Sequence, residues 1–192
     1  MRSRKMRFFS TAVLAAGMMT LLSSCPLSLV FVKFNDPALE AIVKEKLGLR
    51  LTPVTSVDML GLFSLDISGL GINDLTGLEY ALSMTFLDAN NNPISDLRSL
   101  QSCISLRTLN LEDTEVFEIS ALEPLTKLEL VDLCGNAVNN LQPLIDNTGF
   151  NVGDTLTVDC VLVTGPSFTA QTDALTASGV TVFFCDCPPP MP

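Results

Sequence analysis

Residues 65–75 read LDISGLGINDL, and the chain returns to the same pattern at 87–97 (LDANNNPISDL), 109–119 (LNLEDTEVFEI) and 131–141 (VDLCGNAVNNL). Successive copies are 22 residues apart, and five apolar columns stay in phase over four copies. The columns are Leu65, Leu87, Leu109 and Val131; Ile67, Ala89, Leu111 and Leu133; Ile72, Ile94, Val116 and Val138; Leu75, Leu97, Ile119 and Leu141; and Leu78, Leu100, Leu122 and Leu144. This constancy indicates one structural unit repeated four times.

Each copy contains two kinds of apolar spacing. Leu109 and Leu111 alternate like a half-buried strand, whereas Val116 and Ile119 are separated by the three-residue step that suits 3-10 turns. One copy cannot bury its apolar side chains alone, but stacked copies share a continuous core. A 22-residue period with an L-x-L centre is the signature of a leucine-rich repeat. We therefore predict an α/β solenoid: a short horseshoe with parallel strands on its concave face and 3-10 turns on its convex face, whose four repeats occupy residues 62–149.

Two copies carry an asparagine at the turn after the strand. Asn92 and Asn136 can use a buried amide there to satisfy backbone groups of the adjacent coil. Leu70 and Thr114 occupy the same column, so this asparagine ladder is expected to be only half present.

The repeats resemble the internalin type of bacterial leucine-rich repeat, with its 22-residue period and its I-x-D-L turn. Residues 72–75 (INDL) and 94–97 (ISDL) match that motif fully, and 116–119 and 138–141 match it loosely. The resemblance extends over residues 34–185, and it is specific for the fold but not for function.

The same resemblance implies a helical cap before the array, which we place at residues 34–61. Asp36 is a suitable N-cap, Pro37 fits the first helical position, and Gly48 stands where the helix should end. Leu39, Ile42, Val43 and Leu47 fall on one face of that helix.

A second cap is expected at residues 150–187, because an open solenoid end would expose its core to water. We predict a strand over 154–163, a short helix over 169–178 and a strand over 180–184. The Pro-rich tail at 188–192 can form neither helix nor interior strand.

The N-terminus has the order of a secretory signal: a basic leader, an apolar run from Phe8 to Leu22, and small residues. Its last four residues, Leu22 to Cys25, resemble the lipobox of bacterial lipoproteins. That resemblance implies removal of residues 1–24, acylation of Cys25 and a lipid-anchored linker over 25–33, with the body facing the periplasm or the cell exterior. The alternative is ordinary secretion with a cysteine near the cleavage site.

Without the leader, 168 residues would remain, with 7 basic against 21 acidic side chains, a net charge of about −14. Such a surface repels nucleic acid and favours basic partners or cations.

The cysteines divide into three groups. Cys25 is the candidate lipid attachment, and Cys103 shares the inward column of Ala81 and Leu125, which predicts a buried free thiol. The remaining four are disulfide candidates near the C-terminal cap, because disulfides are the default in an exported protein. These are Cys134, Cys160, Cys185 and Cys187. Three pairings are possible, and a bridge from Cys160 to Cys185 or Cys187 would join the last strands. A metal site with four cysteine ligands is disfavoured by the C-x-C spacing.

The sequence offers little catalytic chemistry. It contains no histidine, no nucleophile-elbow motif and no phosphate-cradling glycine loop. Residues 88–92 briefly resemble an EF-hand loop, but Pro93 replaces the required glycine and Ser99 the bidentate glutamate. We therefore expect no enzyme, no cofactor and no metal site.

Counting outward from each strand predicts three rows on the concave face, in which we expect Asp88 and Asp132 to be exposed. The middle row is Asp66, Asp88, Asn110 and Asp132; the row after it is Ser68, Asn90, Glu112 and Cys134; the row before it is Ser64, Phe86, Thr108 and Leu130.

This face has two interpretations. The first is a binding site with an acidic centre and two apolar contacts, Phe86 and Leu130, which would recognise a protein or glycan with a basic surface. The binding candidates are Asp66, Asp88, Asn110, Asp132, Phe86, Leu130, Asn90 and Glu112. The second is a solvated surface of a structural envelope component that has no specific ligand.

Overall fold

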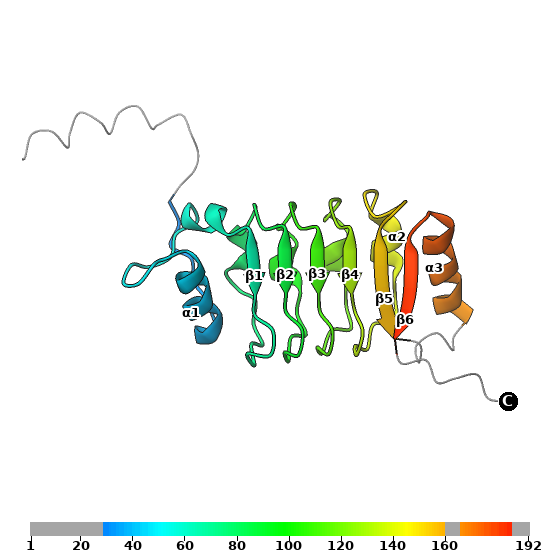
Figure 1. Cartoon of the computed structure of the whole chain (residues 1–192), viewed down its shortest axis with the longest axis horizontal. Helices are drawn as coiled ribbons and strands as arrows, with labels where there is room; N and C mark the ends of the chain where they lie inside the picture. Colours follow the sequence, from blue (N-terminus) through cyan, green and yellow to red (C-terminus); the bar gives the residue numbers. More distant parts are fainter. Residues whose placement is uncertain (1–28, 160–165, 186–192) are drawn as a thin grey trace, which may run out of the picture.

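The computed structural model describes residues 29–159 and 166–185, and its centre is one parallel sheet whose six strands follow chain order (Figure 1). The strands are β1 (Ser64–Asp66), β2 (Phe86–Asp88), β3 (Thr108–Asn110), β4 (Leu130–Asp132), β5 (Thr155–Asp159) and β6 (Thr181–Cys185). From β1 to β4 each residue pairs with its own copy 22 positions later, as Leu65 does with Leu87. The predicted register is confirmed.

Short helical turns form a second stack on the other side of the core. They are η1 (Asp58–Gly61), η2 (Leu78–Tyr80), η3 (Arg98–Leu100), η4 (Ser120–Leu122) and, in the fourth repeat, the short α-helix α2 (Gln142–Asp146). The five apolar columns lie between the two stacks and are almost fully buried. We expected a 3-10 turn in the fourth repeat as well; the helix there begins with a proline in its first turn, which suits a helix start.

The asparagine ladder connects neighbouring coils. Asn92 is buried, donates through Nδ2 to the carbonyl of Ile67 in the preceding repeat, and accepts from Ile72 N–H at 2.9 Å. Two repeats later, Asn136 makes the equivalent bonds: it accepts from the N–H of Val116 and donates to the carbonyl of Leu111. The hydroxyl of Thr114 lies 2.6 Å from Asn136 Oδ1, so a threonine in the intervening position joins the network instead of interrupting it.

One turn position has a left-handed backbone in every repeat, and its N–H donates to the next coil. Asn91 (φ 54°) donates to the carbonyl of Glu112, and Asp113 (φ 51°) donates to that of Cys134. After the fourth repeat, the register of β4 and β5 places Asp159 in the equivalent position, where a side chain instead of a backbone carbonyl is the acceptor. The carboxylate of Asp159 at the end of β5 accepts from the N–H groups of Gly135 and Asn136. This ending was not expected from the sequence.

The N-terminal cap follows the prediction closely. Helix α1 (Pro37–Lys46) begins after Asp36, whose Oδ1 accepts from Ala38 N–H at 2.8 Å, and the chain reverses at Gly48 (φ 70°). Asp36 Oδ2 also accepts from the N–H of Asn73, which joins the cap to the first repeat.

The C-terminal cap consists of β5, helix α3 (Pro166–Ala177) and β6. Helix α3 begins three residues before the predicted start, at a proline, which is favourable in the first turn. The described part of β5 ends at Asp159, and the rest of the strand predicted to residue 163 lies outside the described residues. None of the helices in the described ranges is long and apolar enough to cross a membrane.

Candidate functional site: the concave face

In the structure the residues of the predicted middle row lie side by side on neighbouring strands, and we call this row the acidic line. Asp66 pairs with Asp88, Asp88 with Asn110, and Asn110 with Asp132. Neighbouring parallel strands lie ~4.8 Å apart, so these side chains form a continuous line across four strands.

The concave face extends beyond the repeats, a feature that the 22-residue period does not indicate. The register continues the middle row into Thr157 and Phe183, because β5 and β6 add to the same sheet. Phe183 is 56% exposed and adds an aromatic side chain at the C-terminal end of the row. The 22-residue period fades before these strands, so only the alternation in the predicted strand 180–184 could have indicated this residue.

Each member of the original middle row also has a structural role. Asp66 Oδ1 accepts from Ser68 N–H, and Asp132 Oδ1 accepts from Cys134 N–H, both at 3.0 Å. Asp88 and Asn110 accept in the same way from the residues two positions on. One side-chain oxygen thus closes the turn after every strand, and Asn110 shows that an amide can supply it as well as a carboxylate.

The expectation that Asp88 and Asp132 are exposed is wrong. Asp66 is exposed, but Asp88, Asn110 and Asp132 are half-buried. Asp66 lies on the first strand of the sheet, whereas each of the others has a strand on both sides that removes part of its contact with water.

The pKa values of the carboxyl groups at the two ends of the acidic line are shifted in opposite directions. Hydrogen bonds from the N–H and hydroxyl of Ser68 lower the pKa of Asp66 below its usual value. Burial raises the pKa of Asp132, and the nearby charges of Asp159 and Asp88 add to that effect. The negative charge of Asp132 is therefore unfavourable in the isolated molecule, and a cation or basic group beside it would relieve that cost.

The row before the acidic line supplies the apolar contacts. Phe86 and Leu130 are both exposed, with Thr108 between them. Two strand spacings separate them, or about 10 Å. Two apolar side chains therefore border the carboxylates of Asp88 and Asp132 on the same strands.

Residues of the row after the acidic line are more buried or more bonded within the molecule than those of the row before it. Asn90 donates through Nδ2 to Asp88 Oδ1 at 2.9 Å, and Glu112 is half-buried. Cys134 is buried in a disulfide. Of the predicted binding residues, Asn90 and Glu112 are thus less available to a partner than Phe86 and Leu130.

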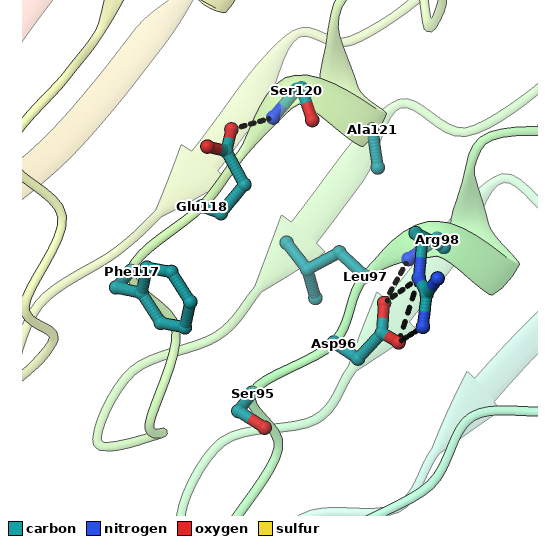
Figure 2. A pocket seen from close by; sticks show the side chains of 8 residues that line it. All are labelled: Ser95, Asp96, Leu97, Arg98, Phe117, Glu118, Ser120 and Ala121. Carbon is teal, nitrogen blue, oxygen red and sulfur yellow. Dashed lines mark hydrogen bonds and ion pairs between the residues drawn. The ribbon is translucent and has the colours of Figure 1, made fainter.

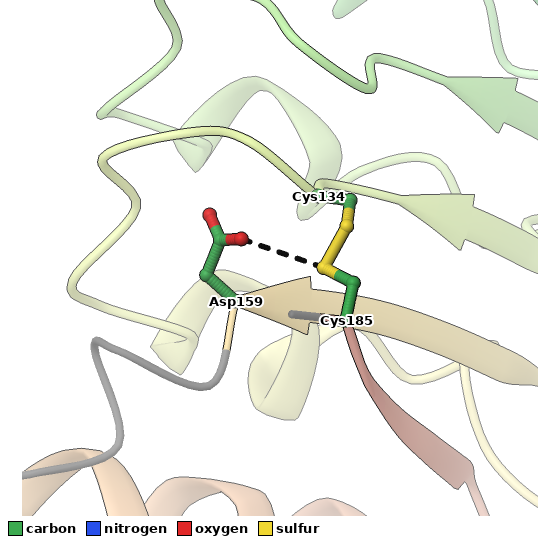
Figure 3. A group of neighbouring side chains, drawn as sticks. All are labelled: Cys134, Asp159 and Cys185. Atoms are coloured by element: carbon green, nitrogen blue, oxygen red, sulfur yellow. Dashed lines mark hydrogen bonds between the residues drawn. A yellow bond between two sulfur atoms is a disulfide. The ribbon is translucent and has the colours of Figure 1, made fainter. Parts of the chain in front are cut away.

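The disulfide joins Cys134 to Cys185 across 51 residues, with the two Cα atoms 6.2 Å apart (Figure 3). The predicted bridge from Cys160 to Cys185 is therefore wrong, since the disulfide of Cys185 joins the last strand to the fourth repeat. Cys160 and Cys187 lie outside the described residues, as do Cys25 and the leader.

Asp159 completes a small cluster with the two sulfur atoms, since one ligand atom from each residue lies within 4.8 Å of the others. A metal would need the thiolates that the disulfide removes. Both carboxylate oxygens of Asp159 already accept backbone N–H groups, as described above. In its oxidised form the cluster is a structural junction.

A shallow pocket lies between the second and third repeats, away from the concave face, and Figure 2 shows its lining. Its charged groups are already paired: Arg98 with Asp96, whose pKa is lowered by that contact, and Glu118 with the N–H of Ser120. The exposed ring of Phe117 forms one wall. Because its charged groups already have partners, the pocket is a weaker candidate than the concave face.

Comparisons with known proteins bear on the fold. No protein-family model matches the sequence, and no curated protein matches it. Among solved structures, the chain is similar to an internalin (inlF) from Listeria monocytogenes, with a TM-score of 0.62 and 22% identity over 78% of this chain and 43% of that one. It is similar to internalin C2 (inlC2) from the same organism, with a TM-score of 0.61 and 23% identity over 78% of this chain and 65% of that one. The chain therefore has the leucine-rich-repeat fold of these internalins and spans less than two thirds of the length of either.

Proposed function

We propose that this internalin-like solenoid is an exported binding module, anchored to a bacterial membrane through acylated Cys25, which captures a protein with a basic surface on its concave face. The observation that carries the proposal is the line of carboxylates in register across the sheet, bordered on the same strands by exposed apolar side chains. A glycan is the less favoured ligand, because it lacks the positive charge that this line would attract.

Charge supports a basic partner. Residues 62–185 contain 16 acidic and 3 basic side chains, so the field over this part of the molecule is strongly negative. Burial and neighbouring carboxylates raise the pKa of Asp132, so a Lys or Arg of the partner beside it would favour its charged form. Complementary charge of this kind steers association and selects partners, while it repels nucleic acid.

The exposed apolar side chains beside the acidic line supply apolar surface that a partner could bury. Phe86 and Leu130 lie one row from the acidic line, and Phe183 lies at its C-terminal end. Aromatic side chains at the centre of an interface often contribute most of the binding energy. An acidic line between apolar contacts therefore favours a basic, partly apolar protein surface.

The test is a double substitution that removes charge without removing the turns. Asp88→Asn with Asp132→Asn keeps an oxygen for each turn, as Asn110 does naturally. We expect capture of the partner from envelope or host-surface extracts to fall at least tenfold, and wild-type capture to weaken with salt. Glu115→Gln with Glu123→Gln is the matched control, because it removes the same charge from exposed positions outside the concave rows.

Two outcomes would contradict the proposal. Equal capture of every wild-type partner by the double variant would make the acidic line a solvated surface. A wild-type protein that captures no partner and instead forms a regular self-assembly would favour the structural envelope component.

The anchor is tested separately. The wild-type protein should fractionate with membranes and Cys25→Ala should not, because acylation at one cysteine with several chains exceeds what stable anchoring requires. Equal membrane retention of both proteins would remove the lipid anchor from the proposal and leave the concave face untouched.

A further inference from the structure

The outer end of the N-terminal cap carries apolar side chains that the stacking of repeats does not use. Residues 30–32 run antiparallel to 54–56, with Phe31 opposite Thr55. The N–H of Val32 donates to the carbonyl of Val54, and the N–H of Ser56 donates to the carbonyl of Val30. The N–H of Val30 also donates to Ser56 Oγ. Val32 is buried, so Leu29 and Phe31, which alternate with it, face outward. Phe31 is 64% exposed.

Two more apolar residues belong to this end. Leu51 is 96% exposed and lies in the loop between α1 and η1, which Figure 1 shows projecting beyond α1 on the side away from the strands. Val57, just beyond the segment paired with Phe31, is also exposed. We call Leu29, Phe31, Leu51 and Val57 the apolar end surface.

This surface is unusual for a cap. The cap of a solenoid normally closes the core on one side and presents a polar face to water on the other. Here the inner side is formed as expected by Leu39 and Val43, which are fully buried. The outward apolar side chains are therefore candidates for a contact outside the chain.

The charges of the molecule are divided along its length. Of the seven basic residues after Cys25, four lie between residues 33 and 50, and four acidic residues balance them within 29–61. The next basic residue is Arg98. The cap is thus neutral overall, with Lys33 and Arg50 exposed beside Phe31 and Leu51, whereas the rest of the described chain is strongly acidic.

The position of the anchor limits what can face this end. Leu29 follows Cys25 by four residues, and an extended chain spans at most ~3.5 Å per residue, so Leu29 lies within about 14 Å of the acylated cysteine. The apolar end surface is held at the bilayer whether or not it binds there, and a weak contact becomes effective at such a high local concentration.

We propose that the apolar end surface docks on the lipid bilayer in which Cys25 is anchored, so that the solenoid stands end-on from the membrane. Leu51 and Phe31 enter the interfacial region, and Lys33 and Arg50 lie at the headgroups of anionic lipids. The acidic repeats are repelled from the same headgroups, which favours this orientation over one in which the sheet lies flat. The inference rests on the proposed lipid anchor.

The orientation has a consequence for the concave face. Five strand spacings of ~4.8 Å separate β1 from β6, so β6 would lie about 24 Å farther from the bilayer than β1. The whole acidic line would then be accessible to a soluble or cell-bound partner.

The chain contains no tryptophan, which permits a direct test with the full acylated protein. Leu51→Trp and, as the matched control, Val152→Trp each place one tryptophan at an exposed site, since Val152 is 78% exposed in the C-terminal cap. Both proteins are reconstituted on vesicles of phosphatidylethanolamine and phosphatidylglycerol, and fluorescence is compared with and without brominated acyl chains. We expect several-fold quenching and a blue shift at residue 51 and neither at residue 152.

A third variant excludes insertion driven by the new tryptophan itself. Adding Phe31→Ser to Leu51→Trp should reduce the quenching several-fold, because the surface loses its second apolar contact. Unchanged quenching would mean that the tryptophan enters the bilayer unaided and would overturn the proposal.

The remaining outcomes separate this inference from the anchor. If both proteins float with the vesicles but residue 51 is not quenched, the end surface does not dock and the anchor stands. Equal quenching at both residues would show a molecule lying flat, which also overturns the proposal. Failure of the acylated protein to float would overturn the anchor and the docking together.

Discussion

At the residue scale, the acidic line shows how one side chain can carry two roles. Oδ1 of Asp66, Asp88, Asn110 and Asp132 closes the turn after each strand, and this role needs an oxygen but no charge. The charge is a separate property whose cost depends on position. It is stabilised at Asp66 by Ser68 and disfavoured at Asp132 by burial and by neighbouring carboxylates.

This difference predicts that Asp132→Asn stabilises the protein at neutral pH. The pKa of Asp132 is raised by folding, so the folded state binds the proton more tightly and ionisation costs stability as the pH rises through that range. Removing the charge should raise the free energy of unfolding at pH 7 by a few tenths to about 1 kcal/mol, the size of a cross-strand charge effect. The gain should vanish below the ordinary carboxyl pKa of ~4, where both states are protonated.

Urea denaturation at the two pH values measures this effect, with Asp66→Asn as the control. The pKa of Asp66 is lowered by folding, so its ionisation favours the folded state and the control should show no gain at pH 7. Equal destabilisation by both substitutions at pH 7 would contradict the electrostatic difference between the two ends of the row.

At the scale of the element, the strands and turns of the four repeats depend on their neighbours for stability. The strands β1 to β4 have only three residues each, and their central side chains are buried only because the next repeat covers them. Stacking makes each repeat a layer of the same core. After the fourth repeat a side chain takes the place of the backbone acceptor, because the carboxylate of Asp159 accepts from the N–H groups of Gly135 and Asn136.

Leu109→Ala should therefore be strongly destabilising. Leu109 is fully buried at the centre of β3, with Leu87 and Val131 as its neighbours on the adjacent strands. A cavity in a packed core of this kind costs ~2–5 kcal/mol of unfolding free energy. Ile104→Ala, at an exposed position of the preceding repeat, should change it by less than ~0.5 kcal/mol. Thermal or urea unfolding compares the two, and a near-zero effect of Leu109→Ala would contradict the packing.

At the scale of the whole molecule, the two caps differ in charge and in covalent structure, and the concave sheet lies between them. The N-terminal cap is neutral and apolar on its outer side, and the C-terminal cap is bound to the fourth repeat by the Cys134–Cys185 disulfide. Because β5 and β6 extend the sheet, the concave face continues to the last strand. The cap therefore enlarges the candidate binding surface as well as closing the core.

Thiol chemistry on the whole chain tests this organisation. Cys103 is a buried free thiol among the described residues, and burial raises its pKa to about 12, so it should react only after denaturation. In the oxidised body with residue 25 absent, we predict one such protected thiol, with Cys160 and Cys187 paired as the remaining two cap cysteines. Titration with a thiol reagent before and after unfolding gives the count. Reaction of all five cysteines in an oxidised sample would contradict the paired set.

The sequence by itself determined the repeat, the register, the start and end of α1 and the burial of Cys103. All of these follow from local or periodic signals: equal spacing places each side chain beside its own copy, and a cap residue acts on the turn that follows it. Only the tertiary structure decided that Cys134 pairs with Cys185, that Phe183 joins the acidic line, that Asp159 ends the ladder and that Asp132 is half-buried. These features depend on how non-repeating segments meet the last repeat and on which side chains cover one another. Segments without a shared period have no regular spacing in the sequence, so the contacts between them could not be predicted from it.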